Sequence, residues 1–318
     1  MLGTTVATRV NNTDFGIPSY DYRETLLASE KVNWKIEDII GGDKKLDFSK
    51  RFMPDALARV EDLRFLDEDE KRILNHIRAY AYLSVFGIVE EFIVPFVLDH
   101  VRPSLDTDDY RVRAYLQFAG EEVKHIQLFK QFCEEFREGF ETDCQVIGPA
   151  SEIGKAVLAH EPLSVALAIL MIEWMTQAHY LDSIKDDADL DPQFKSLLKN
   201  HWIEEAQHAK LDTCMVDVLA DGLSEEEISK AIDGFLAIGG FLDEGLKQQT
   251  IFDLESLERA TGRNFSLDER EEFVTQQLQA NRWTYIGSGM VHPKFQQMLD
   301  RLGADARKRI DEVAPAFA

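Results

Sequence analysis

The segment GEEVKHIQLFK (120–130) carries a glutamate three residues before a histidine, and NHWIEEAQHAK (200–210) carries the same unit. Both units lie in amphipathic stretches of helical period, in which residues three positions apart share one face. Within each unit, the glutamate and the histidine therefore project together: Glu122 with His125, and Glu205 with His208.

A third histidine and a solitary glutamate extend this pattern. His201 lies four residues before Glu205, so it joins the same stripe of its helix. Glu173 is the only formally charged residue between Ser164 and Asp182, in a helical segment that is apolar all round. A lone buried carboxylate is costly or takes up a proton, and bound cations would remove that cost.

The fourth carboxylate has two candidates, Glu90 and Glu91, in the segment SVFGIVEEFIVPFV. A helical projection places a polar group of residues on one side of this helix and Glu91 nearly opposite to it. We therefore favour Glu91 as the residue that faces the centre. Glu90 stays open as the alternative, because sequence separations do not decide between the two.

Helical patterns also dominate the rest of the chain. The long ones extend over 67–100, 106–140, 162–184 and 191–220, with shorter ones over 54–66 and 151–160 and further helices over 223–318. No alternation rich in Val, Ile and Thr indicates a sheet. We predict a single all-α domain over 1–318, made of a four-helix metal-binding bundle (67–220), an N-terminal arm with a short helix (1–66) and a helical C-terminal extension (221–318).

Carboxylates and imidazoles without thiolates suit iron or manganese, and four carboxylates balance the charge of two cations. The sequence therefore predicts a centre of two metal ions. Two glutamates and two Glu-x-x-His units on four helices resemble the ferritin-like di-iron carboxylate proteins. The position of His201 is similar to that of the third histidine in the p-aminobenzoate N-oxygenase family, the arylamine N-oxygenases.

This resemblance implies a ferritin-like four-helix bundle with additional N- and C-terminal helices. It also implies a cofactor of two iron ions, with Mn/Fe as the alternative. The metal ligands that it implies are Glu91, Glu122, His125, Glu173, His201, Glu205 and His208. We identify no catalytic acid–base pair beyond these ligands.

The function implied is that of a dioxygen-activating di-iron oxygenase that acts on a small organic molecule, by N-oxygenation of an amine or by hydroxylation. An external electron donor is expected, because the sequence has no flavin, nicotinamide or iron–sulfur fingerprint. Two alternatives use the same ligands: iron oxidation for storage, and a radical-generating subunit with Tyr180 or Tyr80 near the metals.

Four residues beside the expected ligands have less certain roles. Glu121 and Glu204 would point about 100° away from the neighbouring ligands, so we expect them at the surface or in support of the ligands. Gln177 and Tyr180 share the face of Glu173, where they either orient it or pack in the core.

The net charge of −23 disfavours nucleic acid and anionic membranes as partners. Three cysteines without paired spacing fit a reducing cytoplasm. The first sixteen residues contain no apolar run of the kind that a signal peptide needs, and the longest run, VALAILMI, is too short to span a membrane. We expect a cytoplasmic enzyme, and the helical surface and the resemblance together suggest a homodimer.

Overall fold

The computed structural model describes residues 20–106 and 108–318. Helices make up most of these ranges. Within them, β contacts are limited to two isolated bridges, Gly41 with Lys44 and Arg51 with Leu190. The predicted all-α fold is confirmed.

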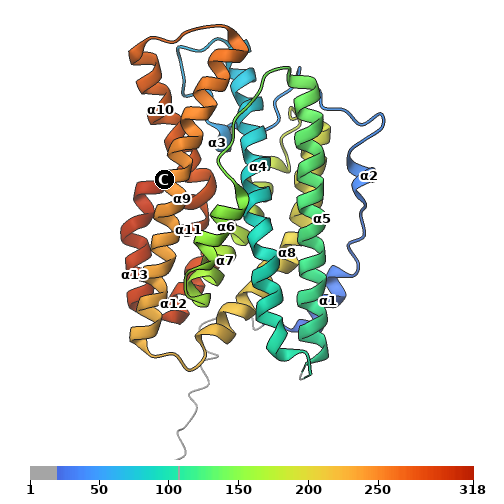
Figure 1. Cartoon of the computed structure of the whole chain (residues 1–318), viewed down its shortest axis with the longest axis vertical. Helices are drawn as coiled ribbons and strands as arrows, with labels where there is room; N and C mark the ends of the chain where they lie inside the picture. The colour runs from blue at the N-terminus through green and yellow to red at the C-terminus, as the bar shows by residue number, and fades with distance from the viewer. Residues whose placement is uncertain (1–19, 107) are drawn as a thin grey trace, which may run out of the picture.

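Four long helices form the central bundle: α4 (Glu68–Val101), α5 (Asp109–Phe140), α7 (Pro162–Ala178) and α8 (Pro192–Ala220). A short 3-10 turn, η1 (Arg102–Ser104), follows α4; α6 (Ala150–Leu158) precedes α7; and the π-helical segment η2 (His179–Ile184) continues α7. In Figure 1, α4 lies between α5 on one side and α6, α7 and α9 on the other.

Three of these helices begin directly after an aspartate that caps them. The side chain of Asp67 accepts hydrogen bonds from the backbone of Asp69 and Glu70, and Asp108 and Asp191 cap α5 and α8 in the same way. Such caps satisfy backbone N–H groups that have no partner within the helix. The caps fix where the helices start, and so the depth at which their glutamates lie.

The N-terminal arm contains α1 (Tyr22–Ser29), α2 (Ile36–Ile39) and α3 (Asp55–Ala58), while residues 1–19 of the predicted arm lie outside the described ranges. The helix predicted over 54–66 is wrong beyond Ala58, because Arg59 turns into the left-handed region with φ of 46°. Side chains from the C-terminal helices take the carbonyl groups at this point. Gln277 donates to the carbonyls of Ala58 and Arg59, and this tertiary contact replaces continued helix.

The C-terminal extension is helical, as predicted. It comprises α9 (Glu225–Thr261), α10 (Leu267–Arg282), the π-helical η3 (Trp283–Gly287), α11 (Ser288–Met290), α12 (Pro293–Leu302), α13 (Ala304–Val313) and the 3-10 turn η4 (Ala314–Phe317). These helices, orange to red in Figure 1, lie on the side of the bundle away from α5. Helix α9 packs on both α4 and α7.

Within the described ranges, one helical segment, Glu68–Ser104, is long and apolar enough to cross a membrane by length and composition alone. Its most apolar window has a mean hydropathy of 1.8, and 56% of that window is buried inside the protein. The core helix of a bundle passes the same test, because contact with its neighbours replaces contact with water.

Gly289 shows how closely the C-terminal helices approach the bundle. A Cβ atom at this position would lie 2.9 Å from the backbone oxygen of Met171 and 2.7 Å from its Cγ. We expect Gly289→Ala to lower the free energy of unfolding by about 1–3 kcal/mol, because overpacking against backbone cannot relax easily. Urea unfolding measures this loss. Gly240→Ala on α9, which meets nothing within 4 Å, is the control, and an equal effect of both changes would contradict the close packing.

Candidate metal centre

Each of the four bundle helices contributes one glutamate to the middle of the bundle. None of these four residues is more than 3% exposed: Glu90 on α4, Glu122 on α5, Glu173 on α7 and Glu205 on α8. Several of their oxygens have no hydrogen-bond partner among the described residues, including Oε2 of Glu90, of Glu122 and of Glu173. Buried, unpaired carboxylate oxygens are costly unless they bind cations.

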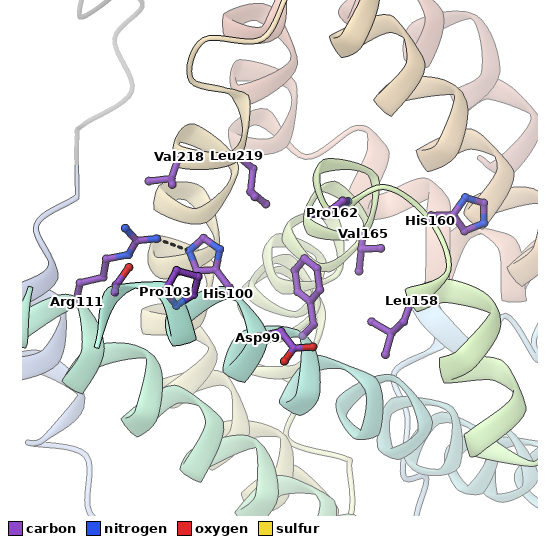
Figure 2. Close-up of a pocket in the computed structure, with 12 residues that line it drawn as sticks. Asp99, His100, Pro103, Arg111, Leu158, His160, Pro162, Val165, Val218 and Leu219 are labelled. Atoms are coloured by element: carbon purple, nitrogen blue, oxygen red, sulfur yellow. Dashed lines mark hydrogen bonds between the residues drawn. The ribbon is translucent and has the colours of Figure 1, made fainter. Parts of the chain in front are cut away.

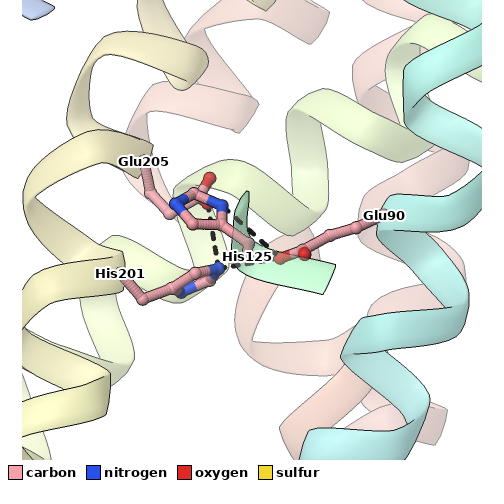
Figure 3. A group of neighbouring side chains, drawn as sticks. All are labelled: Glu90, His125, His201 and Glu205. Carbon is pink, nitrogen blue, oxygen red and sulfur yellow. Dashed lines mark hydrogen bonds and ion pairs between the residues drawn. The ribbon is translucent and has the colours of Figure 1, made fainter. Parts of the chain in front are cut away.

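Three histidines complete the cluster. His201 Nε2 lies 2.8 Å from Glu90 Oε1 and 2.9 Å from Glu205 Oε1. His208 Nδ1 lies 2.9 Å from Glu122 Oε1, and His125 Nδ1 lies 3.0 Å from Glu205 Oε1. The nitrogens and oxygens thus meet one another from different helices, as Figure 3 shows for one half of the cluster.

The ligand atoms form two overlapping groups, each with all its atoms within 4.8 Å of one another. Glu205 and His125 belong to both groups, so the two positions are adjacent. The remaining members are Glu90 and His201 in one group, and Glu122 and His208 in the other. Hard oxygen and imidazole donors in two adjoining sets fit a pair of iron or manganese ions.

Glu173 lies beside these two groups. Its carboxyl group shares a hydrogen bond with Glu205. Burial raises the pKa of Glu173 well above its ordinary value, and the charges of Glu205 and Glu122 raise it further. Burial and then the charge of Glu122 likewise raise the pKa of Glu90 to about 8. Both shifts arise first from burial and then from neighbouring negative charge, and two bound cations would oppose both effects.

The position expected for Glu91 is corrected by the structure. Glu91 points outward, with its side chain 38% exposed and paired with Lys130 at 2.8 Å, while Glu90 faces the cluster. The helical projection failed because it assumed that the polar side of α4 meets solvent. Arg78 on that side is 1% exposed and pairs with Asp253 of α9 at 3.4 Å. The C-terminal helices cover this side of α4 at Arg78. A polar side chain on this side therefore does not show that the side faces solvent.

Glu121 and Glu204 each contact one histidine of the cluster, at the ring nitrogen that faces away from the centre. Glu121 Oε2 lies 3.0 Å from Nε2 of His208, and Glu204 Oε2 lies 2.8 Å from Nε2 of His125. Each of these contacts crosses between α5 and α8. In each case Nδ1 is left to face the centre, which is the arrangement that orients imidazole ligands.

The N-terminal arm covers one side of the cluster, and no sequence pattern indicated this contact. Trp34 stacks on the ring of His125 with 6.0 Å between ring centroids, and Lys124 Nζ lies 3.8 Å from the Trp34 ring centroid. Ser29 on α1 donates a hydrogen bond of 2.6 Å to Glu121. The arm therefore shields His125 from water. It also fixes Glu121, which contacts His208.

Asp212 is a further buried carboxylate that sequence reasoning missed. It is 1% exposed, and neither of its oxygens has a hydrogen-bond partner among the described residues. Burial raises the pKa of Asp212 well above its ordinary value, with His208 offsetting only part of the effect. Its spacing of four residues after His208 and seven after Glu205 places it on the ligand face of α8, and this spacing could have revealed it.

Gln177 and Tyr180, expected either to orient Glu173 or to pack in the core, both pack against α8. Gln177 donates a hydrogen bond of 3.2 Å to the carbonyl of Trp202, and Tyr180 stacks on the Trp202 ring at 4.5 Å. Tyr80 accepts a hydrogen bond from Arg137 and lines a surface groove. These contacts are structural and involve none of the cluster ligands.

A pocket of about 550 Å³ lies at one end of the bundle, lined by residues of α4, α5, α6, α7 and α8 (Figure 2). Its polar lining includes Arg111, which donates a hydrogen bond of 2.9 Å to His100. None of the cluster residues lines it. A much smaller cavity of about 30 Å³ lies next to the cluster, lined by Phe86 and Val89 of α4 and by Ile172 and Met175, which flank Glu173.

We expect Glu90→Gln to weaken binding of one of two iron ions by at least about 10–100-fold, because it removes a charged oxygen from the group that holds His201. Glu91→Gln is the matched control on the same helix and should bind two ions per chain, as the unaltered protein does. Iron counting after anaerobic loading distinguishes them. Equal iron content in the two variants would contradict the assignment.

Glu204→Gln should lower metal affinity by about 10–100-fold, because His125 loses the charged acceptor that orients it. Glu138→Gln, at an exposed position of α5, should leave affinity unchanged. Competition against a chelator of known affinity measures both. If Glu204→Gln binds metal as tightly as Glu138→Gln does, the contact with His125 does not support the centre.

Comparison with known proteins agrees with this geometry. A family profile described as P-aminobenzoate N-oxygenase AurF matches residues 25–230, more than half of the chain. No curated protein matches the chain.

Solved structures of R2-like ligand-binding oxidases resemble it at low similarity. A mutant with a Mn/Fe cofactor is 13% identical, with a TM-score of 0.45 over 85% of this chain and 94% of that one. A mutant with an Fe/Fe cofactor is 14% identical, with a TM-score of 0.44 over 85% and 93%. By the match over residues 25–230, the chain belongs to the P-aminobenzoate N-oxygenase AurF family.

Proposed function

We propose that this protein N-oxygenates a small organic amine with dioxygen at a centre of two iron ions. The observation that carries the proposal is the meeting of three buried carboxylates and three imidazoles inside one helical bundle, with the carboxyl group of Glu173 against Glu205. The proposed ligands are Glu90, Glu122, His125, Glu173, His201, Glu205 and His208. Membership of this family makes an oxidoreductase the expected class of enzyme.

When bound, the two ions supply the one-electron chemistry that reduces dioxygen. The chain itself supplies a fixed set of donors in a site without bulk water. Phe86 and Phe129 pack against the ring of His201, with centroids 6.3 Å and 5.1 Å away, and shield it on the side of the bundle core. In such a low-dielectric site the charges of Glu90 and Glu205 act strongly on whatever is bound between them.

Oxygenation of an amine by one oxygen atom of dioxygen reduces the other atom to water, which requires two electrons and two protons. We propose that a separate electron donor provides the electrons. The support for this is the sequence, which carries no flavin, nicotinamide or iron–sulfur motif. We further propose a homodimer in a reducing cytoplasm, without nucleic-acid or membrane partners. The free thiols of Cys133, Cys144 and Cys214 are consistent with that compartment.

His201 distinguishes this centre from one built on the two Glu-x-x-His units alone. It lies between Glu90 and Glu205, at 2.8 and 2.9 Å, where a water molecule would otherwise complete the donor set. An imidazole at this place gives more nitrogen donation to one ion than to the other. The two ions should therefore differ in their spectra and their potentials.

The proposal is tested by loading the protein with Fe(II) under argon, counting iron, and then adding dioxygen with p-toluidine and a chemical reductant. We expect two ions per chain and formation of the hydroxylamine or of a more oxidised nitrogen product. His201→Ala should change the visible spectrum of the oxidised centre, because an imidazole ligand is lost.

Three outcomes would contradict this function. Continued uptake of iron far beyond two ions per chain would indicate storage. A stable tyrosyl signal in electron paramagnetic resonance would indicate a radical-generating subunit. An unchanged spectrum in His201→Ala would show that this histidine does not bind metal.

A further inference from the structure

The small cavity beside the metal cluster is apolar. Its lining includes Phe86, whose ring contacts His201, and Val89, which precedes Glu90 on α4. The only polar side-chain group in this lining is the hydroxyl of Tyr285, which is buried and has no hydrogen-bond partner among the described residues. At about 30 Å³ the space holds about two water molecules and is too small for an aromatic ring.

A second, open pocket of about 420 Å³ lies directly outside this cavity. It is formed by the segment that precedes and begins α6, with Val146 and Ile153, and by α9, with Phe241 and Phe252. Two residues, Ile147 and Leu242, line both spaces. They therefore form the partition between the outer pocket and the cavity at the metal cluster.

We propose that the organic substrate reaches the metal centre through the outer pocket by displacing the side chain of Ile147, and that this substrate is an uncharged aromatic amine. The inference rests on the proposed function, since it concerns the substrate of the same centre. It adds the route, the residue that controls it and the charge of the molecule admitted.

The side chain of Ile147, and not its backbone, is the part free to move. The backbone N–H of Ile147 donates a hydrogen bond of 3.0 Å to Gln249 Oε1, and Gln249 Nε2 donates one of 3.1 Å to the carbonyl of Gln145. Gln249 is fully buried, and it is fixed in turn by a hydrogen bond to Asp253. The segment is thus tied to α9 at two points. A change of rotamer at Ile147 opens the partition without loss of these bonds.

Gly245 on α9 leaves the room for that movement. A Cβ atom here would lie 3.3 Å from Cδ1 of Ile147, and outside the helix's own backbone no other heavy atom would lie within 4 Å. Glycine inside a helix is about 0.5–1 kcal/mol less stable than alanine. The glycine at this place in α9 is explained by the space that it leaves for the side chain of Ile147.

Charge at the two spaces favours an uncharged molecule. Among the described residues that line them, Glu244 alone is charged, and it pairs with Lys247 at 2.5 Å. A carboxylate that passed Ile147 would lose its hydration and find no cation in the lining. An aromatic amine is uncharged at neutral pH and presents its ring to apolar side chains.

The pocket in Figure 2 offers the opposite chemistry, with Arg111 and His100 in its lining, but shares no residue with the cavity at the cluster. A groove of about 340 Å³ on the other side of Ile147 is bordered by Lys130 and Arg137. Phe129, buried between this groove and His201, closes it from the cluster. The outer pocket beside α9 is therefore the route that the lining residues favour.

The test compares Gly245→Ala with Gly240→Ala, a matched change on the same helix whose new methyl group would meet nothing within 4 Å. With iron-loaded protein and p-toluidine, we expect Gly245→Ala to lower kcat/KM roughly tenfold, because the added methyl group restricts Ile147. Gly240→Ala should match the unaltered protein. Adding Ile147→Ala to Gly245→Ala should restore kcat/KM, because the shortened side chain no longer needs the space.

Two further readouts separate the route from the chemistry. The rate at which dioxygen oxidises the reduced centre without amine should be the same in all variants, because the ligands are untouched. Calorimetric binding under argon should be at least roughly tenfold weaker for p-aminobenzoate than for p-toluidine, as the transfer of a carboxylate without a partner requires.

The proposal is overturned if Gly245→Ala behaves as Gly240→Ala does, if Ile147→Ala fails to restore the activity, or if p-aminobenzoate binds as tightly as p-toluidine. Failure of the proposed function would look different. The unaltered protein would then hold no pair of iron ions or would not consume dioxygen, whereas calorimetry with p-toluidine would still report whether Gly245→Ala obstructs the cavity.

Discussion

The excess of buried negative charge is the constraint on which the rest of the molecule depends. Four carboxylates lie in the apolar middle of a bundle, with three imidazoles between them. Burying these carboxylates without counter-ions carries a desolvation cost, which two bound cations would offset. The surrounding structure is suited to holding two cations. Its helices start at fixed caps, and a covering layer on each side keeps water out.

The covering layers come from the two ends of the chain. On one side the arm brings Trp34 against His125 and Ser29 against Glu121. On the other, α9 and the helices after it close over α4 and α7 and provide part of the lining of the cavity at the cluster. The bundle supplies the donors, whereas the additions to it decide what else can come near them. Differences in substrate among proteins with such a bundle should therefore arise in the added segments.

Much of the fold and most of the centre followed from local patterns. Helical spacing predicted which residues share a face, and the isolated charge of Glu173 in an apolar helix indicated its burial. The failures share one cause. The projection that favours Glu91 over Glu90 and the helix predicted through Arg59 both leave out the C-terminal helices, which bury Arg78 and bind the carbonyl of Arg59. The contact of Trp34 with His125 was equally out of reach, since it joins segments some ninety residues apart without any shared period.

The crossed contacts of Glu121 with His208 and of Glu204 with His125 have a consequence for how the site is assembled. Each helix of the α5 and α8 pair carries the acceptor for the other's imidazole, so a slip of one helix by a single residue, about 1.5 Å along the axis, would break both contacts at once. The two helices are thus interlocked by polar bonds that need no ion. Metal would enter a template already in register, and its exchange would not require the bundle to come apart.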